Sequence, residues 1–132
     1  MAPLVATHSA AHALCPSTRN LTDEQLDAIR DSDGLVGLNF EVSALRADGH
    51  DEPDTPLEVL VNHVDYLVGR LGIGGVAFGS DFDGATMPRE IGDVSGLPHL
   101  LAVLRERGYG EDALRKLAHE NWLRVLAETW RK

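Results

Sequence analysis

Short apolar segments alternate along this sequence with long amphipathic helical patterns, and this alternation limits the possible folds more than any other feature. Strand patterns occupy residues 3–7, 35–40 and 76–79. The middle segment is apolar almost throughout, as expected for a strand that is covered on both faces. Helical patterns begin after Thr22 and Thr55. Strands that alternate with helices form parallel sheets with right-handed crossovers, so the sequence predicts an α/β fold.

The predicted sheet has too few strands to be complete. A loop at 84–96 follows the third strand, and the rest of the sequence predicts helices near 97–107, 111–118 and 120–131. Three parallel strands would leave strand edges uncovered. We therefore expect residues 1–132 to form a single partial domain, a piece of an α/β barrel. The polar segment 41–54 has no periodicity and is expected to be a binding loop.

Both predicted crossover helices begin with the sequence pattern of a capping box. In Thr22–Gln25 the threonine can accept from the third helical amide while the glutamine reaches back. Thr55–Glu58 repeats the pattern, with Pro56 at the first helical position. The second of these helices carries a long apolar stripe over 57–71 that is expected to face the core.

Composition excludes several classes of function. The chain has 12 Lys and Arg against 21 Asp and Glu, for a net charge of −9, and no basic cluster. Binding to nucleic acid or to an anionic membrane is therefore disfavoured. No apolar stretch approaches the roughly 20 residues of a membrane helix, and no leader pattern precedes the first strand, so we expect a cytoplasmic protein. Cys15 is the sole cysteine, which excludes an internal disulfide and favours a packed thiol.

Polar side chains follow each predicted strand at its carboxyl end. His8 follows the first, Asn39 lies in the second, and Asp81 and Asp83 follow the third. Strand alternation would direct both carboxylates to one face and Phe82 to the other. The carboxyl ends of barrel strands hold catalytic groups, and histidine with carboxylates binds zinc. The alternative is that the aspartates cap a turn and that His8 is a hydrogen-bonded turn residue.

Arg19 lies in the loop that leaves the same edge of the predicted sheet. Its planar guanidinium suits a carboxylate held by two hydrogen bonds, although a surface arginine near a helix start is the alternative. The remaining histidines have no close ligand spacing. Two of them, His63 and His119, fall within predicted helices and are expected to be structural or solvent-facing.

Several motifs in this sequence resemble segments of the membrane dipeptidase (renal dipeptidase) family of zinc peptidases, in matching order and at matching separations. The most specific is Gly79–Gly84 (GSDFDG), and the longest is Thr7–Asp23 (THSAAHALCPSTRNLTD). The other matching segments are Gly37–Phe40, His63–Asp65, Asp93–Ser95 and Asn121–Val125.

The resemblance implies a (β/α)8 TIM barrel that hydrolyses dipeptides with two zinc ions bridged by a carboxylate. His8 matches the last metal-binding histidine of the family, and Arg19 matches the arginine that holds the C-terminal carboxylate of the substrate. Asp81 matches an aspartate that contacts the substrate and handles the proton in catalysis. The chain corresponds to the C-terminal part of the family barrel, without the other metal ligands, so we expect it to be inactive alone.

Three interpretations remain at this stage. The first is the C-terminal part of a zinc dipeptidase whose missing half comes from another chain or is lost. The second is a non-catalytic remnant that acts as a binding or assembly module and self-associates through its strand edges. The third is a different amidohydrolase-like barrel, against which the Arg19 segment argues because a carboxylate clamp specifies peptides or amino-acid derivatives.

Overall fold

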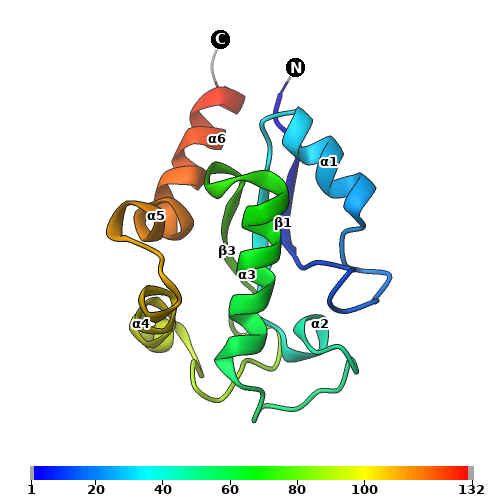
Figure 1. The fold of residues 1–132 in the computed structure, drawn as a ribbon, viewed down its shortest axis with the longest axis vertical. Coiled ribbons are helices and arrows are strands. Elements are labelled where there is room, and N and C mark those ends of the chain that lie inside the picture. The colour runs from blue at the N-terminus through cyan, green and yellow to red at the C-terminus, as the bar shows by residue number, and fades with distance from the viewer. Residues whose placement is uncertain (1, 131–132) are drawn as a thin grey trace.

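A computed structural model describes residues 2–130 and contains a three-stranded parallel sheet (Figure 1). The strands β1 (Val5–Ser9), β2 (Leu35–Asn39) and β3 (Val76–Ser80) lie in the order β1-β2-β3. The predicted α/β class and the parallel arrangement are confirmed. The first strand begins and ends two residues later than predicted, and because it ends at Ser9, His8 lies inside β1 rather than after it.

Two crossover helices pack against each other beside the sheet. The helix α1 (Asp23–Asp31) contributes Leu26 and Ile29 to the main core, and α3 (Leu57–Leu71) contributes its apolar stripe, as predicted. Figure 1 shows α3 running along the sheet at the centre of the molecule. The main core therefore lies between these helices and one face of the strands, and buried residues of the helices after β3, such as Leu100 and Leu117, extend it.

The two helix N-termini are capped in different ways. At α1 the predicted capping box forms, with Thr22 and Gln25 bonded to each other's backbone amides. At α3 the predicted box is wrong, because the hydroxyl of Thr55 donates to the carbonyl of Glu52 instead. A distant side chain caps this helix, since the amide of Leu57 donates to Oε2 of Glu90 at 3.0 Å.

The segment between β2 and α3 is partly helical, which its sequence does not reveal. A short helix in this segment, α2 (Val42–Leu45), buries Val42 and Leu45. Further along the chain, the turn η1 (Ile73–Gly75) connects α3 to β3. The prediction of an irregular loop over 41–54 is therefore correct only after this helix. One turn has too few residues to display a helical period.

Helices follow β3 to the end of the described chain. They are η2 (Val94–Gly96), α4 (Leu97–Arg107), α5 (Glu111–Arg115), the π-helical turn η3 (Lys116–Glu120) and α6 (Asn121–Trp130). A small second core joins α6 to the sheet through Leu35, Ala77 and Val125. Leu35 and Val36 belong to different cores because neighbouring strand residues point to opposite faces.

The sheet is sharply curved where its strands approach one another most closely. A Cβ added at Gly37 on β2 would lie 2.2 Å from the carbonyl oxygen of Thr7 on β1. A Cβ added at Gly79 on β3 would lie 2.4 Å from the same oxygen, although β1 and β3 are not neighbours in the sheet. Register shifts interrupt both strand pairs in this region. Only glycine allows this approach, which bends the sheet in the manner of a barrel wall.

The outer edge of β1 is open to solvent. Leu4 is 47% exposed and Val5 is 39% exposed, whereas all five residues of β2 are buried. Within residues 2–130, none of the helices combines the length and the apolar character that crossing a membrane requires.

Candidate functional site

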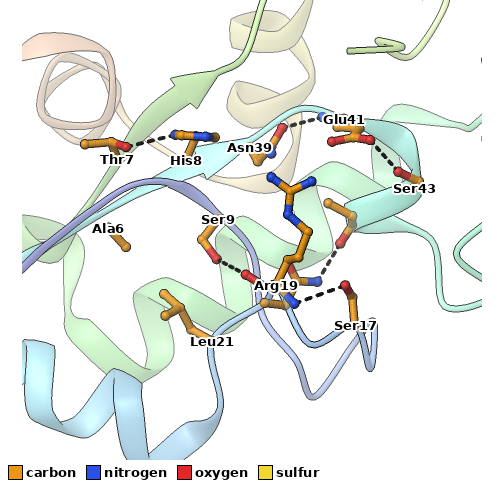
Figure 2. Close-up of a pocket in the computed structure, with 12 residues that line it drawn as sticks. Ala6, Thr7, His8, Ser9, Ser17, Arg19, Leu21, Asn39, Glu41 and Ser43 are labelled. Atoms are coloured by element: carbon orange, nitrogen blue, oxygen red, sulfur yellow. Dashed lines mark hydrogen bonds between the residues drawn. The ribbon is translucent and has the colours of Figure 1, made fainter. Parts of the chain in front are cut away.

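A cavity of about 370 Å³ opens at the carboxyl ends of β1 and β2 (Figure 2). Its wall includes His8 from β1, Arg19 from the following loop, and Asn39 and Glu41 from the end of β2. Asn39 is buried, and its Oδ1 accepts the amide hydrogen of Glu41 at 2.8 Å. The structure therefore brings together a histidine, a guanidinium and a carboxylate from separate parts of the sequence.

His8 is exposed, and one of its ring nitrogens is engaged. Its Nδ1 lies 2.8 Å from the hydroxyl of Thr7. The other nitrogen, Nε2, takes part in no hydrogen bond found within residues 2–130. An imidazole held in this way retains one nitrogen for a metal ion.

The backbone of Arg19 is held on both sides. The hydroxyl of Ser9, a buried residue of β1, donates to the carbonyl of Arg19 at 3.0 Å, and the amide of Arg19 donates to Ser17 Oγ at 3.2 Å. Figure 2 shows the guanidinium directed toward Asn39, between His8 and Glu41. No ion pair found within residues 2–130 includes Arg19, so its charge is available to an anion.

The loop that carries Arg19 is tied to α2 by a buried amide. Asn20 is 4% exposed, and its Nδ2 donates to the carbonyls of Cys15 and Ala44 at 3.1 and 2.8 Å. Cys15 is itself buried, as predicted, and burial raises the pKa of its thiol. The thiol is therefore a packed group rather than a thiolate nucleophile.

His63 on α3 provides a second tie, although the sequence predicts only a structural or solvent-facing residue at this position. It is 1% exposed, its Nδ1 accepts from the amide of Ala11 at 3.2 Å, and its Nε2 lies 2.9 Å from the carbonyl of Leu45. Nε2 therefore carries the hydrogen. Burial holds the pKa of His63 below its usual value, so the ring is neutral.

The acidic turn after β3 differs from its predicted geometry. Ser80, Asp81 and Asp83 have φ angles of 51°, 77° and 66°, so the chain leaves the extended conformation at Ser80. The predicted strand alternation of the two carboxylates is therefore wrong. Phe82 does turn to the core, where its ring contacts Phe40 with centroids 5.8 Å apart. Left-handed backbone at three residues other than glycine is strained, and such strain is concentrated at functional sites.

Asp81 lies near the cavity without being part of its wall. Ser80 pairs with Asn39 across the sheet, and the amide of Phe40 donates to the carbonyl of Ser80 at 2.9 Å. Asp81 is half-buried, directly after this pair, whereas Asp83 is exposed. Among the described residues that line the cavity, Asp81 is absent.

The donors in the described part of the chain do not compose a metal centre. Residues 2–130 contain no group of three or more His, Cys, Asp and Glu side chains placed to hold one ion. A catalytic zinc takes three protein ligands as a rule, and a two-metal site takes more. His8 is therefore a single candidate ligand and not a site.

Comparison with known proteins identifies relatives of this chain. The sequence model of the membrane dipeptidase family, peptidase family M19, matches residues 1–131. An uncharacterized protein in the pqqA 5′ region of Klebsiella pneumoniae is 59% identical over 130 residues. The dipeptidase ataJ of Aspergillus terreus is 36% identical over 128 residues. The matches cover 98% and 96% of this chain.

Solved structures share the fold. A metallopeptidase from Rhodobacter sphaeroides, crystallised with a phosphinate mimic of the dipeptide L-Ala-D-Ala, superimposes with a TM-score of 0.96 and 57% identity over 98% of this chain. Solved structures of dipeptidases of family M19 have a TIM-barrel-like fold, of which this chain covers a part. The chain spans 48% of the Klebsiella protein, 31% of ataJ and 37% of the Rhodobacter chain.

Proposed function

Because the chain belongs to the membrane dipeptidase family, peptidase family M19, we propose that it takes part in the hydrolysis of dipeptides. The observation that carries this proposal is the cavity in which His8 and Arg19 meet. A dipeptide presents a terminal carboxylate close to its only peptide bond. A cation that grips the carboxylate would therefore place that bond a short distance away, on the side of His8.

Arg19 and Asp81 have separate roles in this proposal. Arg19 binds the C-terminal carboxylate through two parallel hydrogen bonds. Asp81 accepts a proton from the attacking water as the oxygen–carbon bond forms, and passes the proton to the leaving amine as the carbon–nitrogen bond breaks. The half-buried position of Asp81 at the strained turn after β3 supports this role.

The metal requirement is a further part of the proposal. Two solved structures that share the fold are of metallopeptidases, and we infer that the complete site uses two zinc ions with His8 as one ligand. The remaining ligands would come from outside this chain, since the donors within residues 2–130 form no group of three or more that could hold an ion. The isolated chain is therefore expected to be inactive.

The test has a catalytic arm and a binding arm. Purified chain with added zinc is incubated with L-Ala-D-Ala and L-Ala-L-Ala, beside an Asp81→Asn variant, and no turnover is expected. Turnover by the wild-type chain that is absent from Asp81→Asn would contradict the predicted inactivity and would support the role of Asp81.

The binding arm uses nuclear magnetic resonance on the ¹⁵N-labelled chain. The dipeptide should shift the backbone amide signals of residues 17–21. The same dipeptide with its C-terminal carboxylate converted to a carboxamide should not shift them. Arg19→Lys keeps the charge but loses the planar fork, so affinity should fall about tenfold. Arg115→Lys, at an exposed arginine on α5, serves as the matched control and should leave the affinity unchanged. Equal affinity for the dipeptide and its amide would contradict the carboxylate site.

The open edge of β1 favours a second candidate function, that of an assembly module. Exposed Leu4 and Val5 lie beside unpaired strand backbone. Such an edge can pair with a strand of another chain, either a partner that completes the barrel or a second copy. A metal-free homo-oligomer without affinity for dipeptides would support this function over the first.

A further inference from the structure

The cavity that contains Arg19 also contains a carboxylate to which the proposed reaction assigns no role. Glu41 lies two residues after the end of β2 and is half-buried. Its amide is held by Asn39, and the hydroxyl of Ser43 donates to its Oε1 at 2.6 Å. Its second oxygen, Oε2, takes part in no hydrogen bond or ion pair found within residues 2–130. One oxygen is thus fixed by the protein, and the other is left for a ligand.

Arg19 and Glu41 line the same cavity without neutralising each other. No contact within 4.0 Å joins their charged groups in the described chain, although both side chains are long. The bond from Ser43 holds the Glu41 carboxylate on its own side of the cavity (Figure 2). A ligand in this space therefore meets one positive and one negative group, each free to pair with a charge of the opposite sign.

The positions of these groups relate them to different parts of a bound dipeptide. In Figure 2 the Arg19 guanidinium lies between His8 on one side and Glu41 on the other. If Arg19 holds the terminal carboxylate, the peptide bond and the N-terminal ammonium extend toward His8. The part of the ligand that reaches Glu41 is then the side chain of the C-terminal residue.

We propose that Glu41 is a specificity-determining residue that favours dipeptides with a cationic side chain, such as lysine, on the C-terminal residue. This inference rests on the proposed function of Arg19. A lysine ammonium on its flexible four-carbon stem would pair with Oε2 of Glu41, and an acidic side chain would be repelled. Since the cavity is open to solvent, the preference is modest, about fivefold in affinity.

The experiment compares two ligands that differ in one charge. Alanyl-lysine and alanyl-norleucine, each with an L- or a D-residue at the C-terminus, are titrated into the ¹⁵N-labelled 132-residue chain at low ionic strength. We expect alanyl-lysine to bind about fivefold more tightly and the difference to shrink in high salt. Glu41→Gln keeps the acceptor for Ser43, so it should retain the affinity for alanyl-norleucine and lose the preference. Glu120→Gln removes an exposed charge elsewhere and should change neither.

The outcomes separate this inference from the proposed function. Equal affinities in the wild type, with binding that Arg19→Ala abolishes, would overturn the role of Glu41 and leave the carboxylate site in place. A preference for lysine that persists in Glu41→Gln would also overturn it. If neither ligand bound the chain at concentrations up to its solubility limit, both the carboxylate site at Arg19 and the role of Glu41 would be overturned.

Discussion

His63 links three segments of the chain through a neutral ring, so its protonation is coupled to folding. Its pKa is lowered by burial in the folded chain, whereas the unfolded chain has the ordinary value of about 6.5. Below that pH the unfolded state binds more protons than the folded state. Stability contributed by His63 is therefore complete above pH 6.5 and is lost as the pH falls through that value toward the folded-state pKa.

The His63 prediction is tested by urea unfolding at a series of pH values from 7.5 to 5.5. The wild type should lose at most about 1.4 kcal/mol per pH unit through this residue. His63→Gln should be less stable at pH 7.5 but flatter in its pH dependence. Parallel curves for the two proteins would exclude His63 as the titrating group.

Asn20 holds the loop of Arg19 through two carbonyls, one of them on α2. Asn20→Ala would leave both carbonyls without their donor in a buried place, so the free energy of unfolding should fall by about 2 kcal/mol. Chemical denaturation measures the loss. Asn62→Ala, at an exposed asparagine of α3, should cost less than about 0.5 kcal/mol. Equal losses for the two variants would show that the Asn20 ties contribute little.

At the scale of elements, two glycine substitutions on different elements should have opposite effects. Gly79→Ala on β3 would place a Cβ 2.4 Å from the backbone oxygen of Thr7, so the curved sheet must shift, at a cost of about 2 kcal/mol or more. Gly69→Ala on α3 meets no atom within 4 Å and should stabilise the helix by about 0.5–1 kcal/mol. Thermal unfolding distinguishes them by the sign of the change. If Gly79→Ala left the unfolding temperature unchanged, the strands would not approach one another as closely as the structure shows.

The start of α3 gives a second comparison between elements. Glu90→Ala removes the acceptor for the amide of Leu57 and should cost about 1 kcal/mol. Glu58→Ala alters the residue that the sequence pattern assigns to the cap but that lies exposed in the structure, and it should cost less than about 0.5 kcal/mol. A larger loss of stability for Glu58→Ala than for Glu90→Ala in denaturant unfolding would show that Glu58, and not Glu90, caps the helix.

At the scale of the whole molecule, the open edge of β1 predicts association. If the edge pairs with another copy, Val5→Lys should lower the associated fraction in sedimentation velocity, because an edge lysine opposes strand pairing. Val94→Lys also replaces an exposed valine, but on η2, far along the chain from the edge, and should leave association unchanged. Association that neither variant alters would place the contact elsewhere.

Local patterns in the sequence determined the class of the fold. Alternating strands and helices predicted the parallel sheet, the stripe on α3 predicted its buried face, and Thr22 with Gln25 predicted a cap that forms. These features succeed because each depends on residues within a few positions of one another. The family resemblance, carried by ordered motifs, is confirmed by the match over residues 1–131.

Only the tertiary structure decided which distant groups meet. The cap of α3 by Glu90, the buried ties of His63 and Asn20, and the meeting of Glu41 with Arg19 join residues that no local period connects. The turn at Asp81 likewise depends on how β3 is held, because left-handed backbone is unfavourable for aspartate without surrounding contacts. A sequence pattern records which face a side chain takes on its own element, whereas a partner across the fold is set by packing.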